Sequence, residues 1–146
     1  MIRRPILASV MALAVAGCGA SSPTTARLEA QAGRVCTQAL AQDARIAPPP
    51  VPAQTAAFLR RGIAVLAPEL ANLRTLHVPH EQADTYTTAI DALAHELTIL
   101  TVTARALDRG ADPLTTIKTL QHRLAPVEAA GNTAWRTLGV PLCVSR

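Results

Sequence analysis

Imidazole and carboxylate side chains gather at one point of the chain, where His77 and His80 flank a proline and Glu81 and Asp84 follow. Such groups are common ligands of zinc and other transition metals. The spacing of these four residues matches no strong metal-binding pattern, and exposed turns collect polar residues in any case. We therefore expect a solvated turn here and no metal site.

Catalytic motifs are missing from the sequence. It contains no Gly-x-Ser-x-Gly, no HExxH and no glycine-rich phosphate loop. His95 and His122 fall off the apolar stripes of their predicted helices, so we expect both on the surface. The apolar faces hold almost no ionisable side chain, which leaves a core without an acid or base. We predict no catalytic residue, no cofactor and no enzymatic activity.

The first residues are typical of a secretory signal peptide. Arg3 and Arg4 precede an apolar run of eleven residues, Ile6–Ala16. As a helix this run would span roughly 17 Å, whereas a bilayer core is about 30 Å thick. It is too short to cross a membrane, so we expect it to be removed.

The end of this segment, Val15-Ala16-Gly17-Cys18, resembles the lipobox of bacterial lipoproteins. The resemblance implies cleavage after Gly17 and a diacylglycerol thioether on Cys18, which becomes the mature N-terminus. It further implies a lipid-anchored protein on the outer side of the cell membrane. The alternative is an ordinary secretory signal with a chance cysteine. The expected organisation is a signal peptide at 1–17, a flexible tether at 18–25 and a folded domain at 26–146.

Two cysteines, Cys36 and Cys143, remain once Cys18 is assigned to the lipid anchor. Export to an oxidising compartment permits disulfides, and a single pair has one possible connectivity. The bond would close a loop of about 108 residues, worth roughly 4–5 kcal/mol in the chain-entropy model. Two buried free thiols are the alternative. We predict a structural disulfide and no redox site, because no CxxC spacing is present.

The composition excludes a nucleic-acid-binding protein. The 146 residues carry a formal charge of +4, which falls to +2 when Arg3 and Arg4 leave with the signal peptide. Only 2% of the residues are aromatic, although 49% are hydrophobic. Neither a basic stripe nor aromatic residues that could stack on bases are available.

The folded domain is predicted to be all-α, because apolar residues recur at helical spacing and no strand pattern competes. We expect helices at about 26–46, 52–76, 81–109 and 113–138, joined by short turns. Such helices favour an antiparallel up-down-up-down bundle. Pro68 and Pro126 are predicted to kink the second and fourth helices. The helix faces predicted to line the core are Leu28, Ala32, Val35, Ala39 and Ile46; Leu59, Ile63, Leu66, Leu70 and Leu73; Tyr86, Ile90, Leu93, Leu97, Leu100, Ala104 and Leu107; and Ile117, Leu120, Leu124, Val127, Gly131, Ala134 and Leu138.

Two features of the predicted bundle allow more than one interpretation. Trp135 is expected to pack over the disulfide-bearing end, although an exposed tryptophan at an interface is the alternative. The third helix is rich in threonine, which is typical of a solvated surface or of a polar contact face for a partner. These threonines are Thr85, Thr87, Thr88, Thr98, Thr101 and Thr103.

Two functions of different class fit these observations, and we predict the first, with the second as the alternative. The first is a membrane-anchored, non-catalytic interaction module that binds another envelope protein or polymer. The second is a carrier or sensor of a small apolar ligand such as a lipid, housed between helices that the prolines separate. An apolar cavity of a few hundred Å³ would favour the carrier. The whole pattern also resembles small uncharacterised lipoproteins of high-GC bacteria, which implies location and architecture only.

Overall fold

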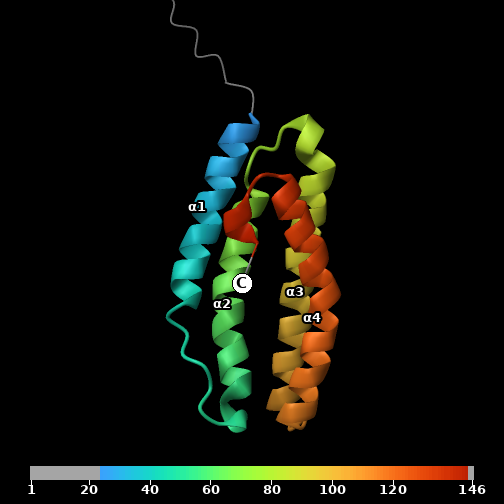
Figure 1. Ribbon diagram of the computed structural model, residues 1–146. Helices are drawn as coiled ribbons and strands as arrows, with labels where there is room; N and C mark the ends of the chain where they lie inside the picture. Colours follow the sequence, from blue (N-terminus) through green and yellow to red (C-terminus); the bar gives the residue numbers. More distant parts are fainter. Residues whose placement is uncertain (1–23, 145–146) are drawn as a thin grey trace, which may run out of the picture.

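A computed structural model describes residues 24–144, and this part of the chain consists of helices joined by loops and turns, with no strand. The predicted signal peptide, Cys18 and most of the predicted tether lie outside the described residues. Four long helices form an antiparallel up-and-down bundle (Figure 1), as predicted. They are α1 (Thr25–Asp43), α2 (Thr55–Arg74), α3 (Ala83–Asp108) and α4 (Pro113–Thr137), with short 3-10 helices η1 (Pro52–Gln54), η2 (His80–Gln82) and η3 (Pro141–Cys143).

Local sequence explains where the helices begin. Thr24 caps α1 by accepting a 3.3 Å hydrogen bond from the Arg27 backbone N–H. Asp112 caps α4 by accepting a 2.8 Å bond from the Thr115 N–H, with Pro113 as the first helical residue. The bond from Thr115 to the ionised Asp112 carboxylate lowers the pKa of that carboxyl group below its ordinary value. Both helix starts therefore agree with the sequence prediction to within one residue.

Glycine ends two of the helices. Gly110 follows α3 with φ +90°, and Gly139 follows α4 with φ +73°. Only glycine adopts this left-handed conformation without steric cost, so these positions stop the helices where the sequence predicts.

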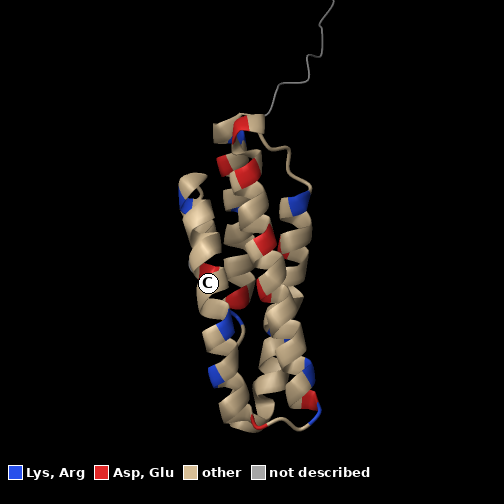
Figure 2. Ribbon diagram, turned by 90° about the vertical axis from the view of Figure 1, so that its right-hand side faces the viewer, with Lys and Arg blue, Asp and Glu red and all other residues tan. Residues whose placement is uncertain are grey.

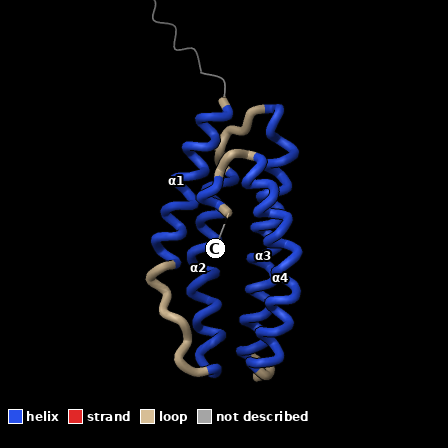
Figure 3. Tube along the Cα trace, viewed as in Figure 1, coloured by secondary structure: helices blue, strands red, loops and turns tan. Residues whose placement is uncertain are grey.

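The end of the first helix was predicted wrongly. It stops at Asp43 and not at Ile46, because the N–H groups of Arg45 and Ile46 bond to carbonyls three residues earlier in a tight final turn. The chain then runs through residues 44–54 alongside α2 to the lower end of the bundle (Figure 3). As a result α1 has 19 residues, whereas α3 has 26.

The helices do not form four equivalent contacts. Helix α3 packs against both α2 and α4, whereas α1 packs mainly against α2 and the C-terminal η3. The predicted disulfide, Cys36–Cys143, is present and joins α1 to η3, with the two Cα atoms 5.2 Å apart. Thus η3 takes the position beside α1 that α4 would occupy in a closed bundle.

Helices α2 and α4 continue through Pro68 and Pro126. Both prolines lie on exposed faces, so water can solvate the carbonyls that lose their helical partner. The size of a bend at these positions stays a prediction.

Two apolar clusters fill the bundle. The upper cluster contains the disulfide, Leu73, Tyr86 and Trp135, and the lower cluster contains Leu59, Ile99, Ala104 and Leu120. Most of the predicted stripe positions lie in or against these clusters, whereas Ile46 lies beyond the end of α1. Within the described residues, no helix is both long and apolar enough to span a bilayer.

Candidate functional site

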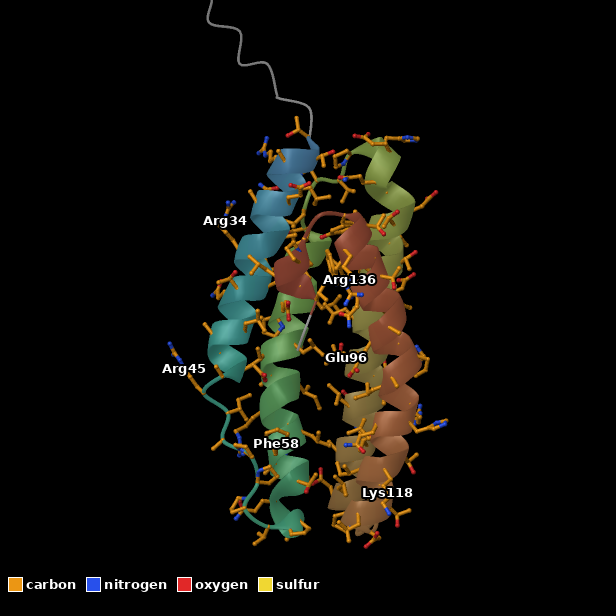
Figure 4. The ribbon with its side chains drawn as sticks, in the orientation of Figure 1. Arg34, Arg45, Phe58, Glu96, Lys118 and Arg136 are labelled. Atoms are coloured by element: carbon orange, nitrogen blue, oxygen red, sulfur yellow. A yellow bond between two sulfur atoms is a disulfide. The ribbon has the colours of Figure 1, made fainter. Side chains whose placement is uncertain are left out.

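A groove of about 300 Å³ lies between the α1–α2 side and the α3–α4 side of the bundle. All four helices contribute to its lining, and Figure 4 labels two of the residues, Phe58 on α2 and Glu96 on α3. Most of the wall is aliphatic or aromatic. Its large apolar side chains include Phe58, Leu59, Leu66, Leu100, Leu120 and Leu124.

The short first helix helps to form this groove. Its last turns contribute Ala39, Leu40 and Asp43, and below Asp43 only the 44–54 loop continues on that side. The lower half of the bundle therefore has three long helices, α2, α3 and α4, where the upper half also has α1 and η3 (Figure 1). This change in the number of packed elements coincides with the hollow.

Gly62 keeps the groove open on the α2 side. It stands in the middle of the α2 residues that face the groove, which are spaced by three or four positions from Phe58 to Glu69. A Cβ atom placed on Gly62 would meet no other atom within 4 Å. Any larger residue would thus project its side chain into the open space.

The charged residues of the groove are all acidic. Asp43, Glu69 and Glu96 line it, and no lysine, arginine or histidine is found among the lining residues that the structure describes. This sign is opposite to the net charge of the chain, which is +4. Figure 2 shows several acidic segments at mid-height of the bundle.

Glu69 corrects the expectation of a core without ionisable groups. Its side chain is only 4% exposed, and Glu96 is half-buried. Each of the two glutamates has an interaction within the protein. The helical spacing could have predicted the burial of Glu69, because it is three residues beyond Leu66 on the same face of α2.

The histidines lie away from the groove. His77, His80, His95 and His122 are all exposed, as expected for His95 and His122. Across residues 24–144, no three side chains of His, Cys, Asp or Glu are grouped so that they could hold a metal ion.

The single tryptophan and the single tyrosine pack together in the upper cluster. Trp135 is 3% exposed and meets Tyr86 edge to face, with ring centroids 5.8 Å apart. This geometry is favourable for aromatic pairs, and it confirms the packing role predicted for Trp135. Burial raises the pKa of Tyr86 to about 12, so its hydroxyl stays protonated at neutral pH.

The threonines of α3 largely bond to their own helix. Thr87, Thr88, Thr98, Thr101 and Thr103 each donate to the carbonyl four residues earlier. Thr103 is buried, so it belongs to neither the solvated surface nor a contact face. For the others, both interpretations stay predictions.

Comparison with known proteins gives no relative: no family model, no curated protein and no solved structure matches this chain. The function is therefore inferred from the groove and from the sequence.

Proposed function

We propose that this protein is a lipid-anchored binding protein, held outside the cytoplasm by Cys18, which takes up a small apolar molecule in the groove between its helix pairs. The observation that carries the proposal is the groove itself, about 300 Å³ in volume and walled mainly by leucine and phenylalanine. Ligand sites typically have a few hundred Å³ and a predominantly apolar lining.

The energetics of the wall favour an aliphatic or aromatic ligand. Each methylene group moved from water into such surroundings gains about 0.8 kcal/mol. The groove is already formed between the helices. Binding in it does not have to open the bundle, which keeps the cost of association low. A ligand with several methylene groups in contact with Phe58, Leu100 and Leu120 would bind measurably.

The chemistry of the lining supports binding without turnover. Among its described residues the only polar side chains are carboxylates, and none is a serine, threonine, cysteine, lysine or histidine that could act as a nucleophile. We therefore propose a carrier or sensor in place of an enzyme.

Native mass spectrometry of the protein extracted from its own membranes in mild detergent tests this function. We expect an added mass of a few hundred daltons beyond the lipid anchor. In a Gly62→Leu variant the added mass should disappear, because the new side chain fills the groove, whereas Gly62→Ala should retain it. An acylated chain with no added mass in any of the three proteins would contradict the proposal.

A second candidate, the interaction module, is favoured by an apolar patch at the lower end of the bundle. Leu114 is 67% exposed and Val51 is 47% exposed, and both line a surface hollow with Pro113 and Ile117. Exposed apolar patches of this kind often mark protein contacts. A protein-sized adduct in the same spectra, lost in a Leu114→Ser variant, would support this function over the carrier.

A further inference from the structure

We propose that the lower end of the bundle docks on the surface of an anionic lipid bilayer. This end, which we call the lower tip, comprises residues 47–62 and 101–120 (Figure 1). It contains the loop before α2, the first turns of α2 and α4, and the last turns of α3. The inference goes beyond the groove and gives the apolar patch of the second candidate function a lipid surface in place of a protein partner.

Exposed apolar side chains are concentrated in the lower tip. Among the described residues four large hydrophobic side chains are strongly exposed, and three of them belong to this end. They are Val51, Val102 and Leu114, of which Leu114 is the most exposed at 67%. The fourth, Leu142, lies in η3. An apolar side chain that projects from a polar surface can enter the boundary between lipid head groups and acyl chains.

The charges of the bundle are separated along its length. The lower tip carries five arginine or lysine side chains and two carboxylates, whereas the rest of residues 24–144 carries six of the former and eight of the latter. Figure 2 shows most acidic segments above the lower tip and basic segments on the helices around it. A cluster of cations beside apolar side chains is typical of surfaces that bind anionic lipids.

The two carboxylates of the lower tip leave most of its cations unpaired. Asp108 forms an ion pair with Arg60, and Asp112 accepts the 2.8 Å hydrogen bond from the Thr115 N–H. The remaining four cations are exposed and have no carboxylate within ion-pair distance among the residues that the structure describes. These four are Arg61, Arg105, Arg109 and Lys118. The lower tip therefore presents unpaired positive charge to its surroundings.

The apolar and the cationic groups lie side by side. Lys118 is four residues beyond Leu114 on the same face of α4, and both line the surface hollow to which Val51 contributes. Arg109 lies in the turn between α3 and α4, at the lower end of the bundle (Figure 1). A bilayer surface is the complement of both groups, since acyl chains accept the leucine and lipid phosphates attract the cations.

The small size of the apolar patch favours a bilayer over a protein. A standard protein interface buries about 800 Å² on each partner and involves about 20–30 residues a side. The lower tip offers three exposed apolar side chains, of which only Val51 and Leu114 share one hollow. A bilayer needs no matching shape, and each cation near an anionic surface strengthens binding about fivefold.

The proposed anchor is compatible with this contact. Cys18 and Thr24 are six residues apart, a stretch of chain that spans at most about 22 Å. Helix α3 has 26 residues, which makes the bundle about 39 Å long. A bundle that tilts can therefore place its lower tip on the same bilayer in which Cys18 is anchored.

Such a contact would bring the groove close to lipid. Thr55 and Ile117 of the surface hollow lie about one turn from Leu59 and Leu120 of the groove wall. An apolar ligand would then pass between bilayer and groove over a short path through water.

Tryptophan fluorescence of the full chain on lipid vesicles tests the inference. In Leu114→Trp the new indole lies at the lower tip, whereas the native Trp135 is buried and gives a constant background. We expect the emission of Leu114→Trp to shift to shorter wavelength on vesicles of phosphatidylglycerol and phosphatidylcholine, and brominated acyl chains in these vesicles should quench it. Phosphatidylcholine alone should give neither effect. Leu142→Trp, a matched change of an exposed leucine in η3, should respond on neither kind of vesicle.

Two further variants, made in the Leu114→Trp background, locate the charge. Arg109→Gln and Lys118→Gln should each shift the equilibrium between docked and free lower tip about fivefold toward the free form. Arg74→Gln removes the same charge from an exposed site at the upper end and should change this equilibrium much less. High salt should release the lower tip, because it screens exposed charges.

The outcomes separate the alternative occupants of the lower tip. An unchanged emission of Leu114→Trp on anionic vesicles would overturn the inference, and a protein-sized adduct lost in Leu114→Ser would then assign the lower tip to a protein. An equal response on both kinds of vesicle, or an equal loss in Arg74→Gln, would overturn the role of the unpaired cations. None of these results depends on a ligand in the groove, which the mass measurement on Gly62→Leu tests separately.

Discussion

The hydroxyl of Tyr86 donates a 2.7 Å hydrogen bond to the backbone carbonyl of Leu73, which connects α3 to the last turn of α2 inside the upper cluster. The tyrosine side chain is 6% exposed, so water competes little for this bond. The same carbonyl also accepts from the Leu76 N–H at 3.1 Å. Tyr86 therefore holds the α2–α3 connection against the core.

Titration of Tyr86 should report directly on folding, because it is the only tyrosine in the chain. Burial raises its pKa from the ordinary value of 10.0 to about 12 in the folded protein. Since the folded state holds the proton more tightly, the contribution to stability is complete below about pH 10. It is lost as the pH rises through 12.

The absorbance of the phenolate in folded and denatured protein measures both pKa values. A Tyr86→Phe variant should lose about 0.5–1.5 kcal/mol of stability at neutral pH, the usual value of a neutral hydrogen bond. Its stability should also depend less on pH between 10 and 12. A folded-state pKa of Tyr86 near 10 would contradict the buried position.

Removal of the disulfide should destabilise the fold strongly. We expect the Cys36→Ala, Cys143→Ala double variant to lose about 2–5 kcal/mol, because the bond closes a long loop. The bonded cysteines are 107 residues apart in sequence. Urea unfolding with and without reductant measures the effect, and the double variant serves as the control since reductant should not change it. Equal unfolding midpoints for the wild type with and without reductant would mean that the disulfide contributes nothing to stability.

Replacement of glycine by alanine should lower the stability of the fold at two positions and raise it at a third. Gly110→Ala and Gly139→Ala should each cost about 1–2 kcal/mol, because alanine strains the left-handed backbone of both positions. At Gly139 the new Cβ would also lie 2.7 Å from Oε1 of Glu29, but that flexible carboxylate can move aside. Gly62→Ala should instead stabilise by about 0.5–1 kcal/mol, since Gly62 is inside a helix and faces open space. Thermal unfolding of the three variants measures these losses and gains of stability. A destabilised Gly62→Ala variant would argue against the open groove.

The contact between α3 and α4 should be sensitive to the volume at Gly131. A Cβ on this buried glycine would be 3.1 Å from the Cβ of Ala92, which is closer than methyl groups pack without a small shift. Gly131→Leu should therefore cost about 1–3 kcal/mol through overpacking. Adding Ala92→Gly should recover part of this loss, and denaturant unfolding of the single and double variants measures the coupling. Additive effects would show that the two residues are not in contact.

Replacement of Cys18 tests the lipid anchor. Cys18→Ser should move the protein from the membrane fraction to the soluble fraction, because the thioether that carries the acyl chains cannot form. Cell fractionation followed by mass spectrometry measures this, with Cys36→Ala as a cysteine control that should stay membrane-bound. Continued membrane association of Cys18→Ser would refute the lipobox prediction.

The helices were predictable because they depend on local sequence patterns. The disulfide was predictable because it depends only on the number of cysteines. The cap at Asp112 and the stops at Gly110 and Gly139 follow from single residue types, and Cys36 and Cys143 were the only pair left. These features need no knowledge of how the helices pack.

The groove was not predictable in the same way, because it depends on tertiary arrangement. Its space arises where α1 ends early at Asp43 and where Gly62 lacks a side chain, and neither feature stands out in a hydrophobic pattern. The seam assigned to α2 contained Leu66 and Leu70 but omitted Glu69, which lies about 60° from Leu66 around the helix and so shares its face. A helix face defined by apolar residues alone does not predict that a carboxylate is buried on it.

The covalent link between α1 and η3 also determines how the molecule responds to mechanical load. A pull applied between a point before Cys36 and a point after Cys143 passes through the sulfur–sulfur bond. The chain between the two cysteines, which includes α2, α3 and α4, is then shielded from stretching. Tension on a chain held at its N-terminus could unwind the first turns of α1 while the groove-bearing part of the bundle kept its shape.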